Sequence, residues 1–463
     1  MSLPAYADYK CSGIKWLGNV PRHWPIYALK RAVDGCKNGL WGEEPDGEND
    51  IAVIRVADFE RSFATVGLDK LTYRSITPKE KESRLIKLGD LLIEKSGGGE
   101  KTLVGCVVLF KHDFEAVTSN FVARMRPLIG FDSQFLCYAF GCLYGGRVNY
   151  PSVKQVTGIQ NLDAESYLQE FFCFPTPSEQ TQIARFLDHE TARIDTLIEE
   201  QQRLVELLKE KRQAVISHAV TKGLDPTVPM KDSGVEWLGE VPAHWTVTKL
   251  KFVTDQVVDC PHETPIYDPD GDYLVIRTAD IDQGVLKPDR MYRLDREQYT
   301  HRTRRMILGK NDVVYSREGE RWGHAALIPK ADLYALGQRM MQLRVCDGIC
   351  PEFFMYQLNS VATYRQGEVD TVGATAPHVN ISTVINYCLM RPGVSEQRKI
   401  ARYLNKILGG LDCLLGESLE MKGLLQERRS ALISAAVTGK IDVRSWQPPD
   451  WKQTPVQEFE EVL

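Results

Sequence analysis

The chain has 463 residues, enough for roughly two to four domains, and its 43 % hydrophobic and 26 % charged residues are typical of a globular protein. No apolar run reaches the length of a membrane span, and the opening residues lack the regions of a secretory signal peptide. The 11 cysteines form no CxxC pair, so we expect a reducing, cytoplasmic setting. A net charge of −5 does not suggest a nucleic-acid-binding protein, so that class has to be judged region by region.

Three sequence blocks occur twice and in the same order. The block IKWLGNVPRHW, which begins at Ile14, returns 221 residues later as VEWLGEVPAHW. SEQTQIARFL from Ser178 and AVISHAVTKGLD from Ala214 each return 217 residues later, as SEQRKIARYL and ALISAAVTGKID. Three co-linear repeats indicate an internal duplication of a long unit. A protein built twice from one plan is expected to meet a target with two similar halves.

Each copy continues with short strand-like runs that are joined by polar loops. In the first copy the runs are IAVIRVADF, LGDLLIEKSG and VGCVVLF, and in the second they are YLVIRTADI, NDVVYSREG and HAALIPK. Arg55 matches Arg277 and Asp90 matches Asp312, both at an offset of 222 residues. A short helical stretch follows in each copy. The pattern therefore predicts two mixed α/β domains.

A long helix is expected at the end of each copy. The first begins with a capping box between Thr176 and Glu179, and it runs to about Thr221, where Gly223 supplies a stop. In the second copy Gly393 occupies the cap position. About 44 residues at about 1.5 Å each give a rod of about 66 Å.

The two predicted helices share an apolar stripe at alternating steps of four and three residues, the spacing of a coiled coil. Each rod's natural partner is the other, so we expect the two helices to pair as a coiled coil. The stripe could instead pack on its own domain, although a rod of this length overhangs a domain of about 150 residues. The residues expected to pair are Ile183, Leu187, Ile194, Leu197, Gln201, Leu208, Ile400, Leu404, Leu411, Leu414, Ser418 and Leu425.

The expected fold class is α+β, with two mixed α/β domains related by a pseudo-twofold duplication and separated by two long helices that form a coiled coil, which the resemblance described below implies to be antiparallel. The α/β domains are expected at 1–176 and 226–393, the long helices at 177–225 and 394–442, and an acidic tail at 443–463.

Catalytic and metal-binding motifs are weak in this sequence. A DNA methyltransferase needs an NPPY-like motif and a glycine-rich cofactor loop, and neither is present. Asp90 with Glu94 and Lys95 hints at a metal nuclease, but the spacing is wrong and the second copy lacks it. The DPDGD stretch at Asp268 lacks the closing glutamate of a calcium loop and is better explained as a turn. We therefore expect no catalytic or metal site.

The doubled order of globular domain and long helix, with W-L-G-x-V-P-x-H-W openings and S-E-Q-x-x-I helix starts, closely resembles the specificity subunit of type I restriction–modification enzymes. The resemblance covers nearly the whole chain, and its doubled, co-linear motifs make it specific. The residues that carry it are Trp16 to Trp24, Trp237 to Trp245, Ser178 to Gln180, Ser395 to Gln397, Gly89 with Asp90, and Asp312.

This resemblance implies two target recognition domains, each of which reads one half of a split, asymmetric double-stranded DNA site. It implies that the two long helices pair antiparallel, in which case Gln201 would meet Ser418 and Glu190 would lie near Arg428. It further implies that the helices set the distance between the domains and dock two copies of an adenine methyltransferase subunit, which restriction subunits then join. It also implies a non-catalytic chain that binds no cofactor, while the partner subunits use S-adenosylmethionine, ATP and Mg.

DNA contacts are expected from polar residues in the loops between strands, because Arg and Lys read guanine while Asn and Gln read adenine. Some of these residues are expected to contact phosphates and position the protein without specifying a base. The candidates in the first copy are Lys95, Ser96, Thr102, Asn120, Arg147, Tyr150, Lys154 and Gln155. The candidates in the second copy are Arg302, Arg304, Arg305, Arg317, Arg321, Gln338, Arg339 and Thr375.

One alternative stays open at this point. The chain could be a non-catalytic scaffold in which a coiled coil clamps two binding domains and the basic loops are merely solvated. A steep fall in duplex binding with added salt would favour the DNA-binding interpretation.

Overall fold

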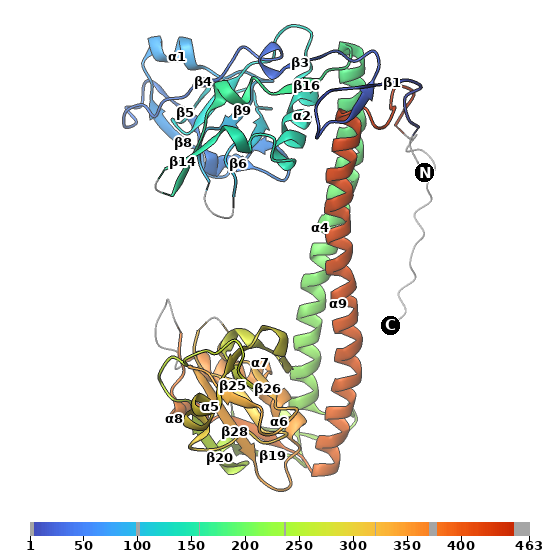
Figure 1. Ribbon diagram of the computed structural model, residues 1–463. Helices are drawn as coiled ribbons and strands as arrows, with labels where there is room; N and C mark the ends of the chain where they lie inside the picture. The colour runs from blue at the N-terminus through green and yellow to red at the C-terminus, as the bar shows by residue number, and fades with distance from the viewer. Residues whose placement is uncertain are drawn as a thin grey trace. The chain divides into compact units, whose positions relative to one another are not determined.

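The computed structural model describes residues 4–98, 102–156, 158–235, 238–319, 321–369 and 377–448. The chain forms two compact units, Met1–Glu200 with Met421–Leu463, and Gln201–Glu420. Each unit therefore contains one α/β domain together with part of each long helix (Figure 1). The domain limits expected from the sequence stay a prediction. Within the described ranges, no helix is long and apolar enough to cross a membrane.

A six-stranded sheet lies at the centre of the first unit, in the order β4-β13-β9-β11-β7-β6. Its middle strand β9 carries an apolar run that is buried on both faces, as expected for a strand covered on each side. Helix α2 (Ser133–Gly145) packs against β11, and the Asp132 side chain caps it by accepting from Phe135 N–H. The strands are β4 (Lys37–Asn38), β13 (Val122–Met125), β9 (Leu91–Glu94), β11 (Val107–Leu109), β7 (Thr65–Val66) and β6 (Phe59–Glu60).

Smaller sheets and helices complete the first unit. A three-stranded sheet of order β12-β5-β8 contains the parallel pair β5 and β12, and another has the order β10-β15-β14. Two further pairs join β1 to β2 and β3 to β16. The bounds are β1 (Tyr9–Cys11), β2 (Asn19–Pro21), β3 (Ile26–Ala28), β5 (Asp50–Ile54), β8 (Thr72–Ser75), β10 (Ser96–Gly97), β12 (Ala116–Thr118), β14 (Val153–Val156), β15 (Ile159–Leu162), β16 (Phe171–Cys173), α1 (Pro78–Arg84) and α3 (Ala164–Tyr167).

The second unit repeats this arrangement. Its four-stranded sheet β20-β28-β25-β26 corresponds to β4-β13-β9-β11, and its sheet β24-β21-β27 corresponds to β8-β5-β12 with the same parallel pair. The bounds are β17 (Met230–Asp232), β18 (Glu240–Pro242), β19 (Thr246–Lys249), β20 (Thr254–Asp259), β21 (Tyr273–Ile276), β22 (Ile281–Asp282), β23 (Val285–Leu286), β24 (Tyr292–Leu294), β25 (Val313–Ser316), β26 (Ala325–Leu327), β27 (Tyr334–Leu336), β28 (Met340–Val345), β29 (Cys388–Arg391), α5 (Arg296–Thr303), α6 (Pro351–Leu358), α7 (Val361–Glu368) and α8 (Ile381–Val384).

Matched charged residues hold the two frames in the same way. Asp90 accepts from Arg126 at 2.7 Å, and Asp312 accepts from Arg344 at 2.7 Å. Both aspartates are buried, so these bonds satisfy charges that would otherwise be costly to bury. The predicted duplication of a mixed α/β domain is confirmed.

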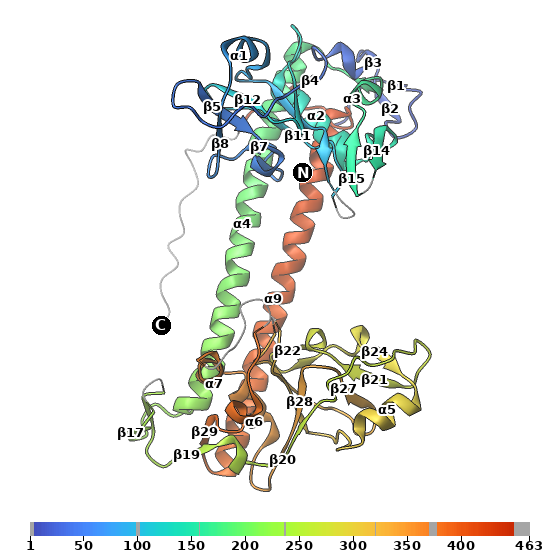
Figure 2. The same ribbon diagram turned by 90° about the vertical axis from the view of Figure 1, so that its left-hand side faces the viewer.

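The long helices are α4 (Pro177–Lys222) and α9 (Val394–Val437), of 46 and 44 residues. The predicted capping box is present, because Glu179 N–H donates to Thr176 Oγ1 and Thr176 N–H donates to the Glu179 carboxylate. Gly223 adopts a φ of +80° directly after α4, the conformation expected of a helix-stopping glycine. The two helices run side by side and antiparallel within each unit (Figure 1, Figure 2).

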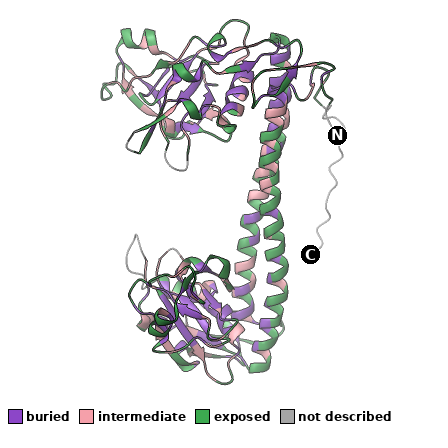
Figure 3. Ribbon diagram, viewed as in Figure 1, coloured by how far each residue is buried: buried purple, intermediate pink, exposed green. Residues whose placement is uncertain are grey.

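The predicted seam is wrong at two equivalent positions. Leu197 and Leu414 are 45 % and 50 % exposed, whereas Ile198 and Leu415, one residue further on, are half-buried. In α4 the less exposed positions advance mostly by four, four and three residues, through Ile194 and Val205, rather than by four and three. Such an 11-residue period favours a slight right-handed supercoil over the left-handed supercoil of a heptad repeat. Figure 3 shows that the buried residues of the long helices gather where a helix lies beside the α/β domain of the same unit.

All three duplicated blocks meet at one place in each unit. In the first unit, the fully buried Trp24 lies beside the end of α9, and a Cβ on Gly439 would come within 3.1 Å of its ring. His23 Nε2 lies 2.9 Å from Glu179 Oε1 at the start of α4. Burial acts to raise the pKa of Glu179, but hydrogen bonds from His23 and the Thr176 main chain outweigh it and hold that pKa below its ordinary value.

The second unit builds the same junction from the other copies of the blocks. Glu396 accepts from Trp245 Nε1 at 3.1 Å and lies 2.9 Å from His244 Nε2. Gly223, at the end of α4, faces the Trp245 ring. The repeated sequence motifs therefore serve the architecture, because they join each helix start to its domain and to the end of the other helix.

The glutamines of the two S-E-Q blocks have matching roles. Gln180 accepts from Asp132 N–H at 2.9 Å and donates to the Pro175 carbonyl, and Gln397 accepts from Cys350 N–H at 2.8 Å and donates to the Pro392 carbonyl. Each amide thus ties the beginning of a long helix to the segment before the domain's own helix.

Candidate nucleic-acid interface

Three chain segments of the first unit meet where strand β9 ends. Lys95 donates its main-chain N–H to the Phe121 carbonyl at 2.8 Å, and its Nζ donates to Asn38 Oδ1 at 2.7 Å. Asn120 is exposed on the turn between β12 and β13, and the ring of Phe121 is 54 % exposed. We call Asn38, Lys95, Asn120 and Phe121 the first strand-end corner. The structure thus brings the predicted Lys95 and Asn120 together with two residues that the sequence analysis missed.

The second unit has an equivalent corner, formed by Asp259, Arg317, Gln338 and Arg339. Arg317 N–H donates to the Arg339 carbonyl at 3.2 Å, as Lys95 does to Phe121. Its guanidinium donates to both oxygens of Asp259, at 3.2 and 3.4 Å. Asp259 stands at the end of β20 where Asn38 stands at the end of β4. The second strand-end corner therefore keeps the frame of the first and changes its side chains.

A hairpin extends the surface beside the first corner. Ser96 Oγ donates to Asn161 Oδ1 at 2.5 Å across the pairing of β10 with β15. Tyr150 precedes β14 and is 62 % exposed, and Lys154 on β14 forms an ion pair of 2.7 Å with an aspartate. Gln155 is exposed on the same strand. The predicted residues Ser96, Tyr150, Lys154 and Gln155 thus belong to one small sheet.

The remaining candidates of the first unit are less closely connected to the corner. Thr102 and Arg147 are exposed, and Arg147 adopts a φ of +55° after the end of α2. Thr375, a candidate of the second unit, lies outside the described residues.

The structure contradicts the prediction that Arg302 contacts DNA. Its side chain is 4 % exposed and donates to the carbonyls of Leu336, Glu263 and Pro261 at 2.7, 3.1 and 3.2 Å. A guanidinium that donates to three main-chain carbonyls, two of them in buried hydrogen bonds, holds loops in place and is not available to a ligand. The polar sequence of helix α5 does not predict that Arg302 is buried, because its burial depends on how the helix packs in the folded domain.

Other basic residues of the second unit stay at the surface. Arg304 is exposed beside His301, and Arg305 donates to the Asp259 carbonyl at 3.2 Å. The hydrogen bond from His301 is the main reason why the pKa of Glu263 lies below its ordinary value. Arg321 is half-buried and bonds to main-chain carbonyls. Arg339 is exposed and adopts a φ of +72°.

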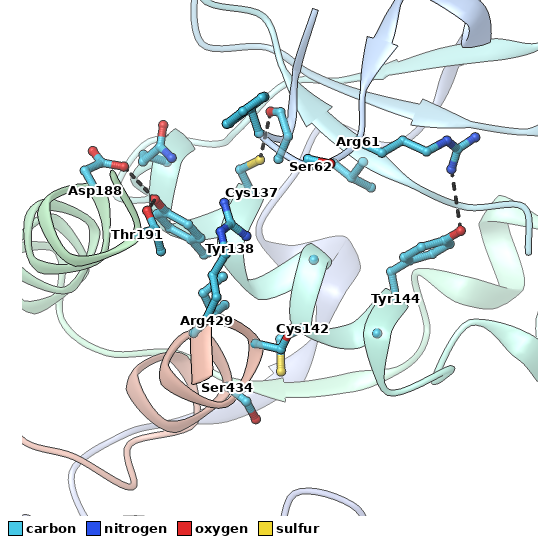
Figure 4. A pocket seen from close by; sticks show the side chains of 18 of the residues that line it. Arg61, Ser62, Cys137, Tyr138, Cys142, Tyr144, Asp188, Thr191, Arg429 and Ser434 are labelled. Carbon is cyan, nitrogen blue, oxygen red and sulfur yellow. Dashed lines mark hydrogen bonds between the residues drawn. The ribbon is translucent and has the colours of Figure 1, made fainter. Parts of the chain in front are cut away.

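A groove of about 1100 Å³ lies in the first unit between α2 and the adjacent parts of α4 and α9. Tyr138 and Asp188 point toward each other there, with a hydrogen bond of 2.8 Å (Figure 4). Burial raises the pKa of the Cys137 thiol to about 12, so it is not a ready nucleophile at neutral pH. A second groove of about 730 Å³ lies at the matching place in the second unit, beside Arg212 and Asp412.

The carboxylates that hinted at a metal nuclease are engaged in ion pairs. Asp90 is bound by Arg126, and Glu94, which is fully buried, is bound by Arg61 at 2.8 Å. Among the residues that the structure describes, no group of three His, Cys, Asp or Glu could hold a metal ion.

Comparisons with known proteins agree with this arrangement. Residues 262–413 match the family described as the type I restriction modification DNA specificity domain. The chain is 23 % identical over 294 residues to the MjaVIII type I restriction enzyme specificity subunit of Methanocaldococcus jannaschii, covering 62 % of this chain and 66 % of that one. It is 20 % identical to the putative MjaX specificity subunit of the same organism, covering 93 % and 96 %, and 22 % identical to the EcoKI specificity subunit of Escherichia coli K12, covering 78 % and 76 %.

Two solved structures share the fold. One, from a study of complex assembly and conformational transition of the type I R-M system, has a TM-score of 0.68 at 14 % identity and covers 91 % of this chain and 99 % of that one. The other, the HsdS subunit of Thermoanaerobacter tengcongensis, has a TM-score of 0.50 at 14 % identity and covers 91 % and 98 %. The second half of the chain thus carries a type I restriction modification DNA specificity domain, and over most of its length the chain is similar to specificity subunits of type I restriction–modification enzymes.

Proposed function

We propose that this chain reads a bipartite, asymmetric target in double-stranded DNA and directs the methyltransferase and restriction subunits of a type I restriction–modification complex to it. Each α/β domain reads one half of the target. The observation that carries the proposal is the pair of strand-end corners, which share one frame and present different side chains.

The asymmetry of the target follows from the chemistry of the two corners. The first offers a lysine, two asparagines and an exposed aromatic ring, and the second offers an aspartate, two arginines and a glutamine. Groups that donate and accept in different patterns match different base edges in the major groove. Two such readers on one duplicated frame favour a target whose halves differ in sequence.

The chain acts without catalysis of its own, as a specificity subunit does. We propose that two methyltransferase subunits and the restriction subunits assemble with it, and that they use S-adenosylmethionine, ATP and Mg. Two matching grooves beside the helices are consistent with two copies of one partner. Action on genomic DNA would place the complex in the cytoplasm.

The test combines the chain with its methyltransferase partner subunit and S-adenosylmethionine. Plasmid DNA should then acquire methyladenine at one two-part sequence, as mapped by single-molecule sequencing. Binding to a duplex that carries this sequence should weaken steeply with added salt, because phosphate contacts release counterions. The scaffold alternative predicts neither result. Methylation by the isolated chain would contradict the non-catalytic role.

A further inference from the structure

We infer that Asn120 and Gln338 each read one adenine, the first in one half of the target and the second in the other half. The inference rests on the proposed function and adds the residues that set specificity. Both side chains are amides, and they stand at the same position of the duplicated frame although the sequences around them differ (TSNF and LGQR).

The main-chain bonds of the two turns establish that the positions are equivalent. In the first unit, Ser119 N–H donates to the Ile54 carbonyl of β5 at 2.9 Å, directly before Asn120. In the second unit, Gly337 N–H donates to the Ile276 carbonyl of β21 at 2.8 Å, directly before Gln338. On the other side of each amide, the next carbonyl accepts from the residue after the central strand, as described for the two corners.

These bonds fix where each amide begins. The Phe121 carbonyl accepts from both Lys95 and Ser96, at 2.8 and 3.2 Å, so the first turn is tied to two strands. In the second turn, a Cβ on Gly337 would lie 2.7 Å from the Ile276 carbonyl, which requires glycine at this close approach. A turn held on both sides presents its side chain in a defined place, and such preorganisation is what base recognition needs.

The neighbouring cations are engaged within the protein. Lys95 Nζ donates to Asn38, and the guanidinium of Arg317 is 6 % exposed between Asp259 and Glu318. We therefore assign Arg317 a positioning role, since its donors are used to hold β20 and the loop after β25. The amides are solvent-accessible on both turns: Asn120 is exposed beside the exposed Phe121, and Gln338 is half-buried beside the exposed Arg339.

An amide matches adenine better than any other base. Its carbonyl oxygen accepts from adenine N6–H₂ while its NH₂ donates to adenine N7, and such a bidentate pair discriminates by about 1–3 kcal/mol. Replacing the amide by a carboxylate of the same shape removes the donor and leaves two acceptors. The adenine preference should then fall by about 5- to 150-fold at one base position.

The experiment maps methylation by the complex with the methyltransferase subunit, comparing wild type with Asn120→Asp and Gln338→Glu. Asn120→Asp should relax or change one position in one half-site, and Gln338→Glu should do so in the other half only. Asn49→Asp is the matched control, because Asn49 is an exposed amide of the first unit that bonds to Asp46. It should leave the motif unchanged, and all variants should keep the wild-type melting temperature.

Asn120→Ala separates base reading from repulsion of phosphate by a new carboxylate. Relaxation at one position supports the inference, whereas equal weakening on all sequences identifies a phosphate contact and overturns it. A motif that is unchanged in both Asn120→Asp and Gln338→Glu also overturns it. If the wild-type complex methylates no two-part sequence, the proposed function itself fails, so the two failures are distinguishable.

Discussion

Arg429 of α9 donates two hydrogen bonds to Asp195 of α4, at 2.8 and 3.2 Å. The duplication repeats this pair in the second unit, where Arg212 donates to Asp412 at 3.0 Å. Each residue of one pair lies 217 positions from its counterpart in the other. The antiparallel helices are therefore held in register by one ion pair used twice, at the floor of each groove.

The contribution of the Asp195–Arg429 ion pair to stability should be measurable by exchanging the charges of the two residues. Asp195→Arg and Arg429→Asp should each lower the free energy of unfolding, and the double variant should recover about 0.5–1 kcal/mol relative to the sum of the single variants. Urea unfolding of the four proteins gives this coupling. The control is the same cycle on Glu190 and Arg428, since Glu190 bonds to Arg193 at 3.2 Å and to His189 at 3.1 Å. Coupling in the control cycle alone would contradict the register.

The sequence predicted the helices and their antiparallel partnership better than it predicted their contacts. The expected pair of Glu190 with Arg428 assumed a centre of symmetry at Gln201 and Ser418. Strict steps of four and three residues also placed Leu197 on the predicted seam, but its side chain is 45 % exposed in the structure. Counting in heptads assumes a repeat of about 3.5 residues per turn, whereas the burial along α4 follows a repeat of about 3.67 residues per turn. Only the burial in the structure reveals this difference in period.

The corners show the same limit. Lys95 and Arg317 could be matched through the strands before them, because apolar strand sequences survive duplication. Asn38 and Asp259 could not, since they reach the site from strands whose place beside β13 and β28 is set by the sheet. Arg302 resembled its exposed neighbour Arg304 in every property visible in the sequence, and only packing distinguishes the two.

That contrast predicts opposite phenotypes for Arg302 and Arg304. Arg302→Ala leaves three carbonyls without their donor, two of them in buried hydrogen bonds, so it should lower the free energy of unfolding by about 3 kcal/mol. Arg304→Ala should leave stability unchanged and weaken DNA binding by the complex equally on all sequences, with a shallower salt dependence. Melting temperature and salt titrations measure both effects. The reverse outcome would restore Arg302 as a DNA contact.

The glycines that end the long helices should differ in their tolerance of alanine. Gly439 and Gly223 have φ of +72° and +80°, a conformation that costs alanine about 1–2 kcal/mol. A Cβ on Gly439 would also lie 2.3 Å from Pro21 Cδ, whereas on Gly223 the nearest atom, in Trp245, is 3.3 Å away. Gly439→Ala should therefore lower the melting temperature more than Gly223→Ala does.

A third glycine isolates the backbone contribution to these effects. Gly47 has a φ of +81° and nothing within 4 Å of its added Cβ, so Gly47→Ala should show the conformational cost alone. Equal melting temperatures for all three variants would mean that the contact with Pro21 is relieved without cost.

The junction at the start of α4 should make stability depend on acid. The pKa of Glu179 lies below its ordinary value of 4.5, so its contribution is complete above that pH and is lost as pH falls through the lowered value. The difference in unfolding free energy between wild type and Glu179→Gln should be larger at pH 5.5 than at pH 3, because the Glu179 carboxylate is protonated in between. Exposed Glu165→Gln is the control and should show no such change. A difference that grows in acid would contradict this assignment.

The helices should set the spacer of the target. Adding four residues between Glu200 and Gln201 of α4, and four between Glu420 and Met421 of α9, leaves the helix contacts inside each unit unchanged. One added turn moves a domain by about 6 Å along the helix, which corresponds to nearly two base pairs at about 3.4 Å each. The strand-end corners are untouched, so the methylated sequence should keep both half-sites and change its spacer by one or two base pairs. A four-residue insertion at the exposed Gly47 loop is the control and should keep the original spacer. An unchanged spacer with full activity after the paired insertion would show that the helices do not set the distance.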